Sequence, residues 1–376
     1  MGNWAIVVGI NEYPPLAKQG ALQGAVADAC DFADWALDPA GGNVPAEHLF
    51  FWTYPWPTAP QGRLQAYIAG GPPQWYNVDL GSADPNPTRA PNALEITTTI
   101  ESLGRTVRAK AMEDGDTGTR RVYVFLAGHG IRAKTVDRSE ETCFLAGDFR
   151  PINNGNLAAG LVPCDSFRRA LLNDRFDEAI LFTDCCRTQT ARSALMAQPV
   201  SDYSGQPIAP HSIAYAAQDD MLAHETTQPP VRGAFSSALM RGLRTHRTGA
   251  SSDLYAATLK QYVLDNIKDF TATGQKPNMW FHPDGDGPLI VRGAPAVAGP
   301  MPTVRLIDVS ALPNGTQLIL NGGDNTPLPG IQPLVVTGPN MATPPLAPGL
   351  YSIDVNDGSG RYTTFKHPSA EPVYVG

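Results

Sequence analysis

Apolar runs of strand length alternate with amphipathic stretches of helical period over about residues 4–290 of the chain. The runs span about four to eight residues, as strands buried on both faces of a parallel sheet do. The amphipathic stretches predict helices that cover the sheet. This alternation predicts an α/β fold, with a mostly parallel sheet and helices on both faces. The strands are expected at 4–10, 48–53, 120–126, 178–183 and 211–217, and the helices at 24–37, 93–112, 165–172, 234–243 and 252–270.

The pattern changes twice along the chain. Residues 53–91 form an insertion rich in proline, and an irregular connection of more than about 12 to 15 residues is usually functional or disordered. This insertion is expected either to cap a site or to bind a partner. Residues 294–302 are small and proline-rich, which predicts a linker. Residues 303–376 show short apolar runs and no helical period, so a small all-β, sandwich-like domain is predicted after a first domain at 1–293.

Charge and cysteine content narrow the class of protein. The chain of 376 residues carries a formal net charge of −8 with dispersed lysines and arginines, so nothing favours binding to nucleic acid. Its five cysteines are an odd number without C-x-x-C spacing, which indicates reduced thiols in the cytoplasm. No basic leader precedes the first strand, and no run approaches the roughly 18 to 20 apolar residues of a membrane span. A cytoplasmic protein without a membrane partner is expected.

Two short motifs directly after predicted strands carry the candidate chemistry. The sequence AGHG places His129 after the strand at 120–126, and DCCR places Cys186 after the strand at 178–183. Because parallel strands bring their carboxyl ends to one edge of a sheet, both side chains are expected in one crevice. They are the parts of a cysteine nucleophile with its base. The glycines beside His129 permit a tight turn that frees nearby N–H groups for an oxyanion.

Several of these residues also have a structural interpretation. Cysteine is among the most buried residue types, and Cys185 is expected in the core. Cys186 is instead expected to be the nucleophile, because His129 follows another predicted strand in the same way. The alternative role for Asp184 is to cap the following helix, and the alternative for Asp28 is a solvated charge on a helix. The other histidines lack metal-ligand spacing, so no metal site is predicted. No nucleotide-binding or serine-hydrolase motif is present either.

Five segments together resemble the caspase-like cysteine peptidases, in particular the metacaspase and bacterial caspase-homologue branch. They are, in order, WAIVVGINEYP, LQGAVADACDF, VYVFLAGHG, ILFTDCCR and GAFSSALMRGL, and the resemblance covers about residues 4–290. The two central motifs are specific in combination, because they follow strands in the order His then Cys at the spacing of about 50 residues known for caspases. The resemblance implies a caspase-like fold and hydrolysis of peptide bonds.

The resemblance also implies roles for individual residues. His129 would be the general base and Cys186 the nucleophile, with the N–H groups of Gly130 and Cys186 as donors to the oxyanion. Asp184 and Asp28 would form an acidic pocket for the side chain that precedes the scissile bond. Two carboxylates favour arginine first and lysine second, because a guanidinium can donate two hydrogen bonds to a carboxylate. Cleavage after basic residues is therefore expected.

Further expectations concern substrate and cofactors. The edge at Ala216 and Ala217 is expected to pair with an extended peptide by strand addition. Protein or peptide substrates are implied, and no organic cofactor is. Calcium activation is not favoured, because this sequence matches only weakly the acidic cluster that many metacaspases use for it. Its candidate members are Asp137, Glu140, Glu141 and Asp148.

The sequence leaves two other functions open. One is a catalytically silent caspase-like module that binds or scaffolds a partner, and the other is a cysteine hydrolase that acts on a non-peptide acyl bond. The C-terminal β-domain is expected to recruit substrate, regulate access through a partner or mediate assembly. The resemblance to bacterial caspase homologues implies a setting in bacterial stress or defence.

Overall fold

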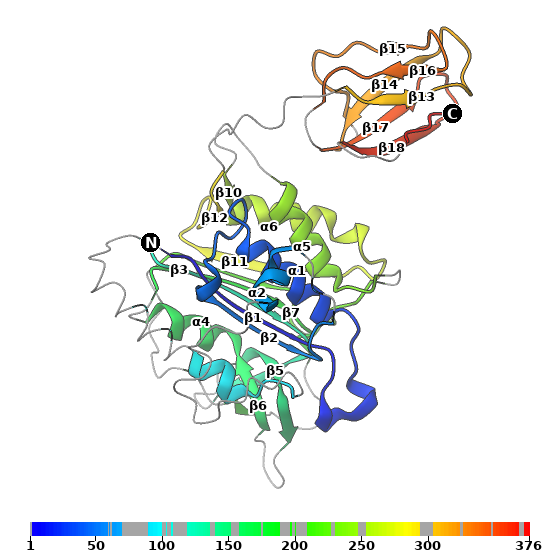
Figure 1. Cartoon of the computed structure of the whole chain (residues 1–376). Helices are drawn as coiled ribbons and strands as arrows, with labels where there is room; N and C mark the ends of the chain where they lie inside the picture. The colour runs from blue at the N-terminus through cyan, green and yellow to red at the C-terminus, as the bar shows by residue number, and fades with distance from the viewer. Residues whose placement is uncertain are drawn as a thin grey trace. The chain divides into compact units, whose positions relative to one another are not determined.

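The computed structural model contains two compact units, Met1–Ala294 and Pro295–Gly376 (Figure 1). The division falls in the proline-rich segment that separates the two sequence patterns. The structure describes residues 2–58, 60, 62–69, 89–99, 103, 107, 119–135, 140–151, 158–173, 176–188, 196–197, 200, 209–226, 230–246, 253–293, 304–323, 326–346, 349–367 and 372–376.

The first unit is built on a six-stranded sheet with the strand order β11-β9-β7-β3-β1-β2. Five strands run parallel, and the edge strand β11 is antiparallel to β9. The predicted mostly parallel sheet is therefore confirmed. The strands are β1 (Trp4–Ile10), β2 (Leu49–Tyr54), β3 (Arg121–Ala127), β7 (Glu178–Asp184), β9 (His211–Tyr215) and β11 (Asn278–His282).

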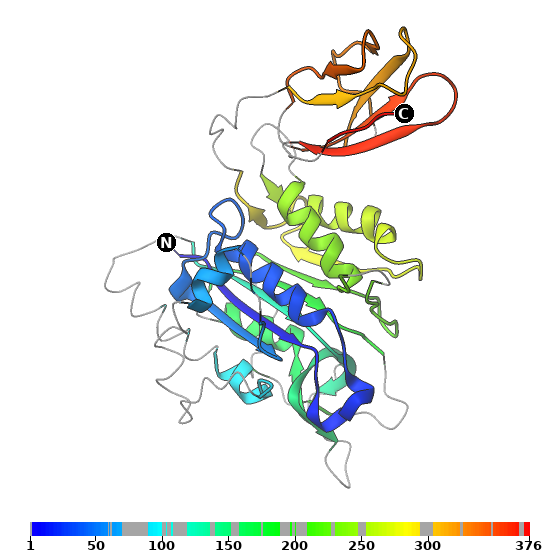
Figure 2. The same ribbon diagram turned by 45° about the vertical axis from the view of Figure 1, so that its right-hand side comes forward.

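Helices cover both faces of this sheet, as Figures 1 and 2 show. In β1, Ala5 and Val7 pack into the core on one face, whereas Ile6 and Val8 pack into the core on the other, because alternate side chains of a strand point to opposite sides. The first face lies under α1 (Ala25–Leu37), α2 (Gly62–Ala69), α5 (Ala234–Thr245) and α6 (Ala256–Asn266). The second lies under α4 (Cys164–Leu172) and the helical residues 93–99.

A second sheet, with the order β6-β5-β4-β8, departs from the expected alternation of strand and helix. The strand of this sheet that comes first in the sequence, β4, begins directly after His129, so the sheet is continuous with the candidate site. Two further short strands, β10 and β12, pair with each other, and β10 lies at the start of 252–270, where only a helix was expected. The additional strands are β4 (Gly130–Thr135), β5 (Glu140–Pro151), β6 (Ala158–Pro163), β8 (Met196–Ala197), β10 (Leu254–Tyr255) and β12 (Leu289–Val291).

The connections include short helical turns and part of the proline-rich insertion. Within 53–91, α2 packs Leu64 into the core, whereas residues 70–88 lie outside the described part of the chain. Whether the insertion caps a site stays a prediction. The short 3₁₀ helices are η1 (Pro14–Gly20), η2 (Ala46–His48) and η4 (Ile267–Asp269).

The second unit is all-β in its described residues. A four-stranded antiparallel sheet with the order β15-β14-β17-β18 and a separate pair, β13-β16, surround one core that includes Ile307, Leu320 and Ile353. The predicted all-β, sandwich-like domain is confirmed. Its strands are β13 (Leu306–Asp308), β14 (Gln317–Gly322), β15 (Leu334–Val335), β16 (Asn340–Ala342), β17 (Gly349–Val355) and β18 (Tyr362–His367).

Candidate active site

His129 and Cys186 occupy corresponding positions after two neighbouring parallel strands. In the register of β3 and β7, Ala127 lies opposite Asp184. The N–H of Gly128 donates to the carbonyl of Asp184 at 3.0 Å, which extends the pairing beyond the strands. Each candidate residue stands two positions beyond the last register pair. The imidazole and the thiol therefore come from adjacent strand ends.

Two groups of the N-terminal segment hold His129. Its peptide N–H donates to the Tyr13 hydroxyl at 2.8 Å, and its Nε2 lies 2.9 Å from the carbonyl oxygen of Gly20. Because a carbonyl only accepts, this contact assigns the proton to Nε2 and leaves Nδ1 as the basic nitrogen. Burial lowers the pKa of His129, although the Gly20 hydrogen bond and the charge of Glu225 raise it. The ring is thus a neutral base at neutral pH.

The Cys186 thiol is held by the backbone of Ala223. The Ala223 N–H donates to Sγ at 3.4 Å, and Sγ donates to the Ala223 carbonyl at 3.7 Å. Burial raises the pKa of Cys186, as does the charge of Asp184, whereas the Ala223 N–H lowers it. The thiol is therefore protonated at rest. Among the described residues no hydrogen bond joins Sγ to the ring of His129, so each group rests on a backbone partner.

One edge of β4 lies against the loop that carries Cys186. A Cβ added to Gly130 would lie 2.7 Å from the carbonyl oxygen of Cys186 and would collide with the Cys185 thiol. Further along, the Arg132 N–H donates to the Thr188 carbonyl at 3.1 Å. Only glycine at position 130 permits this close approach. Cys185 is buried, which confirms its predicted place in the core.

The direction of the Gly130 N–H follows from the pairing of β4 with β5. The carbonyl of His129 accepts from the Leu145 N–H at 2.9 Å, which marks 129 and 145 as a hydrogen-bonded pair. Gly130, opposite Phe144, is consequently a non-hydrogen-bonded position, since the two kinds of pair alternate in an antiparallel ladder. Its N–H therefore points away from β5 and toward the Cys186 loop.

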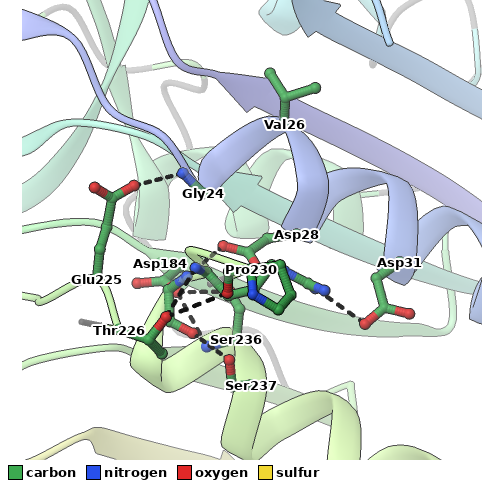
Figure 3. Close-up of polar contacts among 12 residues, drawn as sticks. Gly24, Val26, Asp28, Asp31, Asp184, Glu225, Thr226, Pro230, Ser236 and Ser237 are labelled. Carbon is green, nitrogen blue, oxygen red and sulfur yellow. Dashed lines mark hydrogen bonds and ion pairs between the residues drawn. The ribbon is translucent and has the colours of Figure 1, made fainter. Parts of the chain in front are cut away.

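Asp28 of α1 and Asp184 at the end of β7 converge on the start of α5 (Figure 3). Asp28 Oδ2 accepts from the Gly233 N–H at 2.7 Å. Asp184 Oδ2 accepts from the Ser236 N–H at 3.0 Å and from its hydroxyl at 2.5 Å. A Cβ at Gly233 would collide with the Asp184 carboxylate and would lie 3.0 Å from Asp28 Oδ2. The two carboxylates, which we call the acidic pair, thus meet around one glycine.

Burial dominates the electrostatics of the acidic pair. It raises the pKa of Asp28 to about 7, where the charge of Arg232 opposes it and that of Asp184 adds to it. It raises the pKa of Asp184 to about 6, against the two hydrogen bonds from Ser236. The interpretation of Asp28 as a solvated charge is wrong, because its side chain is buried. Asp184 does cap a helix, but that helix is α5, not one that directly follows the motif.

Arg232 and Glu225 bring further charge to the acidic pair, and sequence reasoning missed both. The Arg232 guanidinium forms an ion pair with Asp28 and another with Asp31 at 3.0 Å. Glu225 Oε1 accepts from the Gly24 N–H at 2.5 Å, at the start of α1. Both residues lie far along the chain from α1, so no local pattern announces these contacts.

Arg187 ties the Cys186 loop to the neighbouring strands. Its Nε donates to Thr142 Oγ1 at 2.6 Å and its Nη1 donates to the Ala217 carbonyl at 3.2 Å. Its guanidinium lies 4.1 Å from the centre of the Tyr215 ring and pairs with Asp219. A buried cation with these partners fixes the position of the loop relative to β5 and β9.

The edge at Ala216 and Ala217 is buried and already engaged. The Ala216 N–H donates to the Thr183 carbonyl at 2.9 Å, and the Ala216 carbonyl accepts from the Gln275 side chain at 2.9 Å. The Ala217 carbonyl accepts from Arg187. Pairing of this edge with a substrate peptide stays a prediction.

The acidic residues considered for calcium mostly have protein partners. Glu140 pairs with Arg132, and Glu141 pairs with Arg169 at 2.7 Å. Asp137 lies outside the described residues, and Asp148 accepts from the Ala93 N–H at 2.9 Å. The described residues contain no group of three or more His, Cys, Asp or Glu side chains arranged to hold a metal ion.

The cysteines and the helices bear on the expected setting of the protein. All five cysteines are free thiols. Across the described ranges, none of the helices combines the length and the apolar character that crossing a bilayer requires.

Comparison with known proteins places the first unit in a family. The family model described as the caspase domain matches residues 2–283. A curated relative, a probable protease from a Desulfuromonadales bacterium, is 28% identical over 251 residues, which are 65% of this chain and 26% of the relative. The chain therefore spans about a quarter of that relative's length.

Two solved structures are also similar. Caspase-1 from Spodoptera frugiperda has 13% sequence identity and a TM-score of 0.41, covering 74% of this chain and 86% of its own. The structure titled pro-sf-caspase-1 has 12% identity and a TM-score of 0.39, covering 74% of this chain and 90% of its own. The family model, which spans well over half of the chain, decides the assignment: the chain belongs to the caspase-domain family.

Proposed function

We propose that the protein is an endopeptidase that hydrolyses peptide bonds after arginine, and less readily after lysine, through Cys186 and His129. One observation carries the proposal. The thiol and the imidazole follow register-matched ends of β3 and β7, and Asp184, which ends β7, belongs to the acidic pair. The two catalytic groups and a binding group for a cationic side chain thus arise from the adjacent ends of β3 and β7.

The proposed reaction is acyl transfer to the thiol. His129 Nδ1 takes the proton from Cys186 as Sγ attacks the carbonyl carbon of the basic residue, and the resulting imidazolium gives that proton to the leaving amine of the next residue. The Gly20 carbonyl keeps the ring in the required tautomer through Nε2. Water then attacks the acyl-enzyme, which releases the acid and restores the thiol. No cofactor takes part in these steps.

The oxyanion of the tetrahedral intermediate is proposed to accept from the N–H groups of Gly130 and Cys186. The ladder geometry supports this role for Gly130, because its N–H points away from β5 and toward the nucleophile loop. One such donor typically lowers the barrier by about 3 to 4 kcal/mol. The contact of Ala223 with Sγ has to give way when substrate enters.

The acidic pair supports selection of a cation. Two buried carboxylates with raised pKa values gain more from a neighbouring positive charge than exposed ones do, since the interaction is stronger where water is excluded. A guanidinium also fits a carboxylate with two parallel hydrogen bonds, which an ammonium does not. Arginine is therefore proposed ahead of lysine.

The test is turnover of fluorogenic peptides ending in Arg, Lys, Asp or Leu. The variants are wild type, Cys186→Ala and Asp28→Asn, each with calcium and with a chelator. Arg-directed turnover that disappears in Cys186→Ala and falls at least about tenfold in Asp28→Asn is expected. Faster cleavage after aspartate would show that the acidic pair does not receive the substrate side chain, and cleavage of no peptide would favour the silent module.

We also propose a setting in the bacterial cytoplasm during stress or defence, with a regulatory partner bound by the second unit. Free thiols suit a reducing compartment. The experiment is a comparison of new protein N-termini in stressed bacteria that express wild type or Cys186→Ala. New termini that follow arginine only with the wild type are expected, and identical sets would contradict this setting.

A further inference from the structure

One segment of the chain contacts both the nucleophile and the acidic pair. At its beginning, Ala223 holds the Cys186 thiol through its N–H and its carbonyl. Close to its end, Arg232 pairs with Asp28. The Thr226 N–H donates to the Arg232 carbonyl at 2.7 Å, so the described parts of segment 223–233 are joined to each other. The chain itself lies where a peptide and its basic side chain are proposed to bind.

Both carboxylate oxygens of Asp28 accept a hydrogen bond, one from Arg232 and one from the residue after it. Arg232 Nε donates to Asp28 Oδ1, and the adjoining Gly233 N–H donates to Oδ2 at 2.7 Å. Arg232 Nη2 donates to Asp31 at 3.0 Å. The Arg232 side chain remains 20% exposed, whereas that of Asp28 is 2% exposed. A cation at the surface thus covers a carboxylate that is otherwise shielded from solvent.

We propose that Arg232 is a specificity-determining residue that competes with the substrate for Asp28. In the free enzyme its guanidinium occupies the carboxylate, and an arginine of the substrate displaces it. This inference rests on the proposed function, because it assigns the same carboxylate to the substrate. Occupancy by Arg232 reduces the fraction of enzyme that can bind an arginine peptide. The apparent affinity for that peptide is the intrinsic affinity multiplied by this fraction.

The competition predicts a selective change in KM. Arg232→Ala frees Asp28, so the KM for arginine peptides should fall by about 5-fold to 30-fold, whereas kcat stays within about twofold. The KM for a leucine peptide should not change, because that side chain does not require Asp28. A residue that merely braced the fold would instead lower kcat for every peptide.

Arg244 offers a matched control. It pairs with the same Asp31 and lies 3.4 Å from Asp34, but in the described residues it makes no ion pair with Asp28. Arg244→Ala therefore removes an equal charge from the same surface and should leave both KM values within about twofold. Arg232→Lys keeps a competing cation with a single ammonium, so its KM should lie between those of wild type and Arg232→Ala.

The kinetic experiment uses the full chain at about pH 8.5, above the pKa of Asp28, with melting curves to show that each variant is folded. A fall in KM confined to arginine peptides and to Arg232 variants is the expected result. If wild type cleaves arginine peptides but Arg232→Ala leaves KM unchanged or raises it, the competition is refuted while the proposed function stands. If other peptides are cleaved and arginine peptides are not, both fail.

A binding measurement covers the case in which no peptide is cleaved. In the Cys186→Ala background, calorimetric titration with benzamidine, a small cation with guanidinium-like hydrogen bonding, reports on Asp28 without catalysis. Binding should be at least about fivefold tighter after Arg232→Ala than before it, and unchanged after Arg244→Ala. Equal affinity in all three backgrounds would overturn the competition whatever the protein's activity.

Discussion

Replacing Arg187 with methionine removes a buried cation from the position next to Cys186 and keeps the apolar stem of the side chain. The Thr142 hydroxyl and the Ala217 carbonyl lose a charged donor at 2.6 and 3.2 Å. The Tyr215 ring loses a guanidinium 4.1 Å from its centre. Asp219, whose side chain is 52% exposed, is left with water as its partner.

The expected loss follows from these contacts. A hydrogen bond that involves a charged group contributes about 1.5 to 3 kcal/mol, and a desolvated cation–π contact contributes about 2 kcal/mol. The exposed partner Asp219 adds less than about 1 kcal/mol. Burying the guanidinium costs the wild type several kcal/mol of desolvation. The variant avoids this cost, which offsets part of the lost stability. A net loss of about 2 to 4 kcal/mol remains, which corresponds to about 3–7 °C in the melting temperature of a unit of this size.

Thermal unfolding followed by circular dichroism measures this loss, with Arg132→Met as the matched control. Arg132 pairs with Glu140 and with Asp220, whose side chains are 37% and 58% exposed. Its replacement should cost less than about 1 kcal/mol. A melting temperature of Arg187→Met within about 1 °C of wild type, or equal shifts in the two variants, would refute the assignment of Arg187 as a buried tie between the loop and the strands.

Three further predictions concern the site. The ratio of kcat/KM for arginine over leucine peptides should rise as the pH increases through about 6 to 7, because Asp184 and Asp28 lose their protons there. The ionisation of the catalytic groups affects both peptides equally and cancels in the ratio. A ratio that does not change with pH would contradict this prediction. Tyr13→Phe leaves the peptide N–H of His129 without its acceptor and should destabilise the protein by about 1 to 3 kcal/mol in urea unfolding, so an unchanged midpoint would argue against that contact. Gly233→Ala forces a Cβ into the Asp184 carboxylate and should raise the KM for arginine peptides more than for leucine peptides, and equal increases would count against a substrate role for the acidic pair.

The central sheet could be predicted from sequence because strands buried on both faces are continuous apolar runs. The observed β1 at Trp4–Ile10 and β7 at Glu178–Asp184 lie at the predicted positions. The second sheet could not, because β4 reads GIRAKT and mixes buried and exposed positions within six residues. Such a short strand has too few apolar residues to show a period of two.

The candidate nucleophile and base were visible because their residue types are distinctive after a strand. Backbone partners leave no such signature, so the roles of the Gly20 and Ala223 carbonyls could not be foreseen. The pairing of Arg232 with Asp28 spans 204 positions, and no local pattern connects residues so far apart. The structure therefore adds the groups that contact His129, Cys186 and the acidic pair.

The residues of the site are widely spaced along the chain, which has a consequence for its synthesis on the ribosome. Cys186 leaves the ribosome well before Ala223 and Arg232, which contact its thiol and Asp28 in the folded unit. At about 5 to 20 residues per second, the stretch between Cys186 and Arg232 takes about 2 to 9 seconds to synthesise. During that interval α5, which fixes the Asp184 carboxylate through Ser236, does not exist. The groups on which the proposed activity depends are therefore complete only after segment 223–233 and α5 have been made.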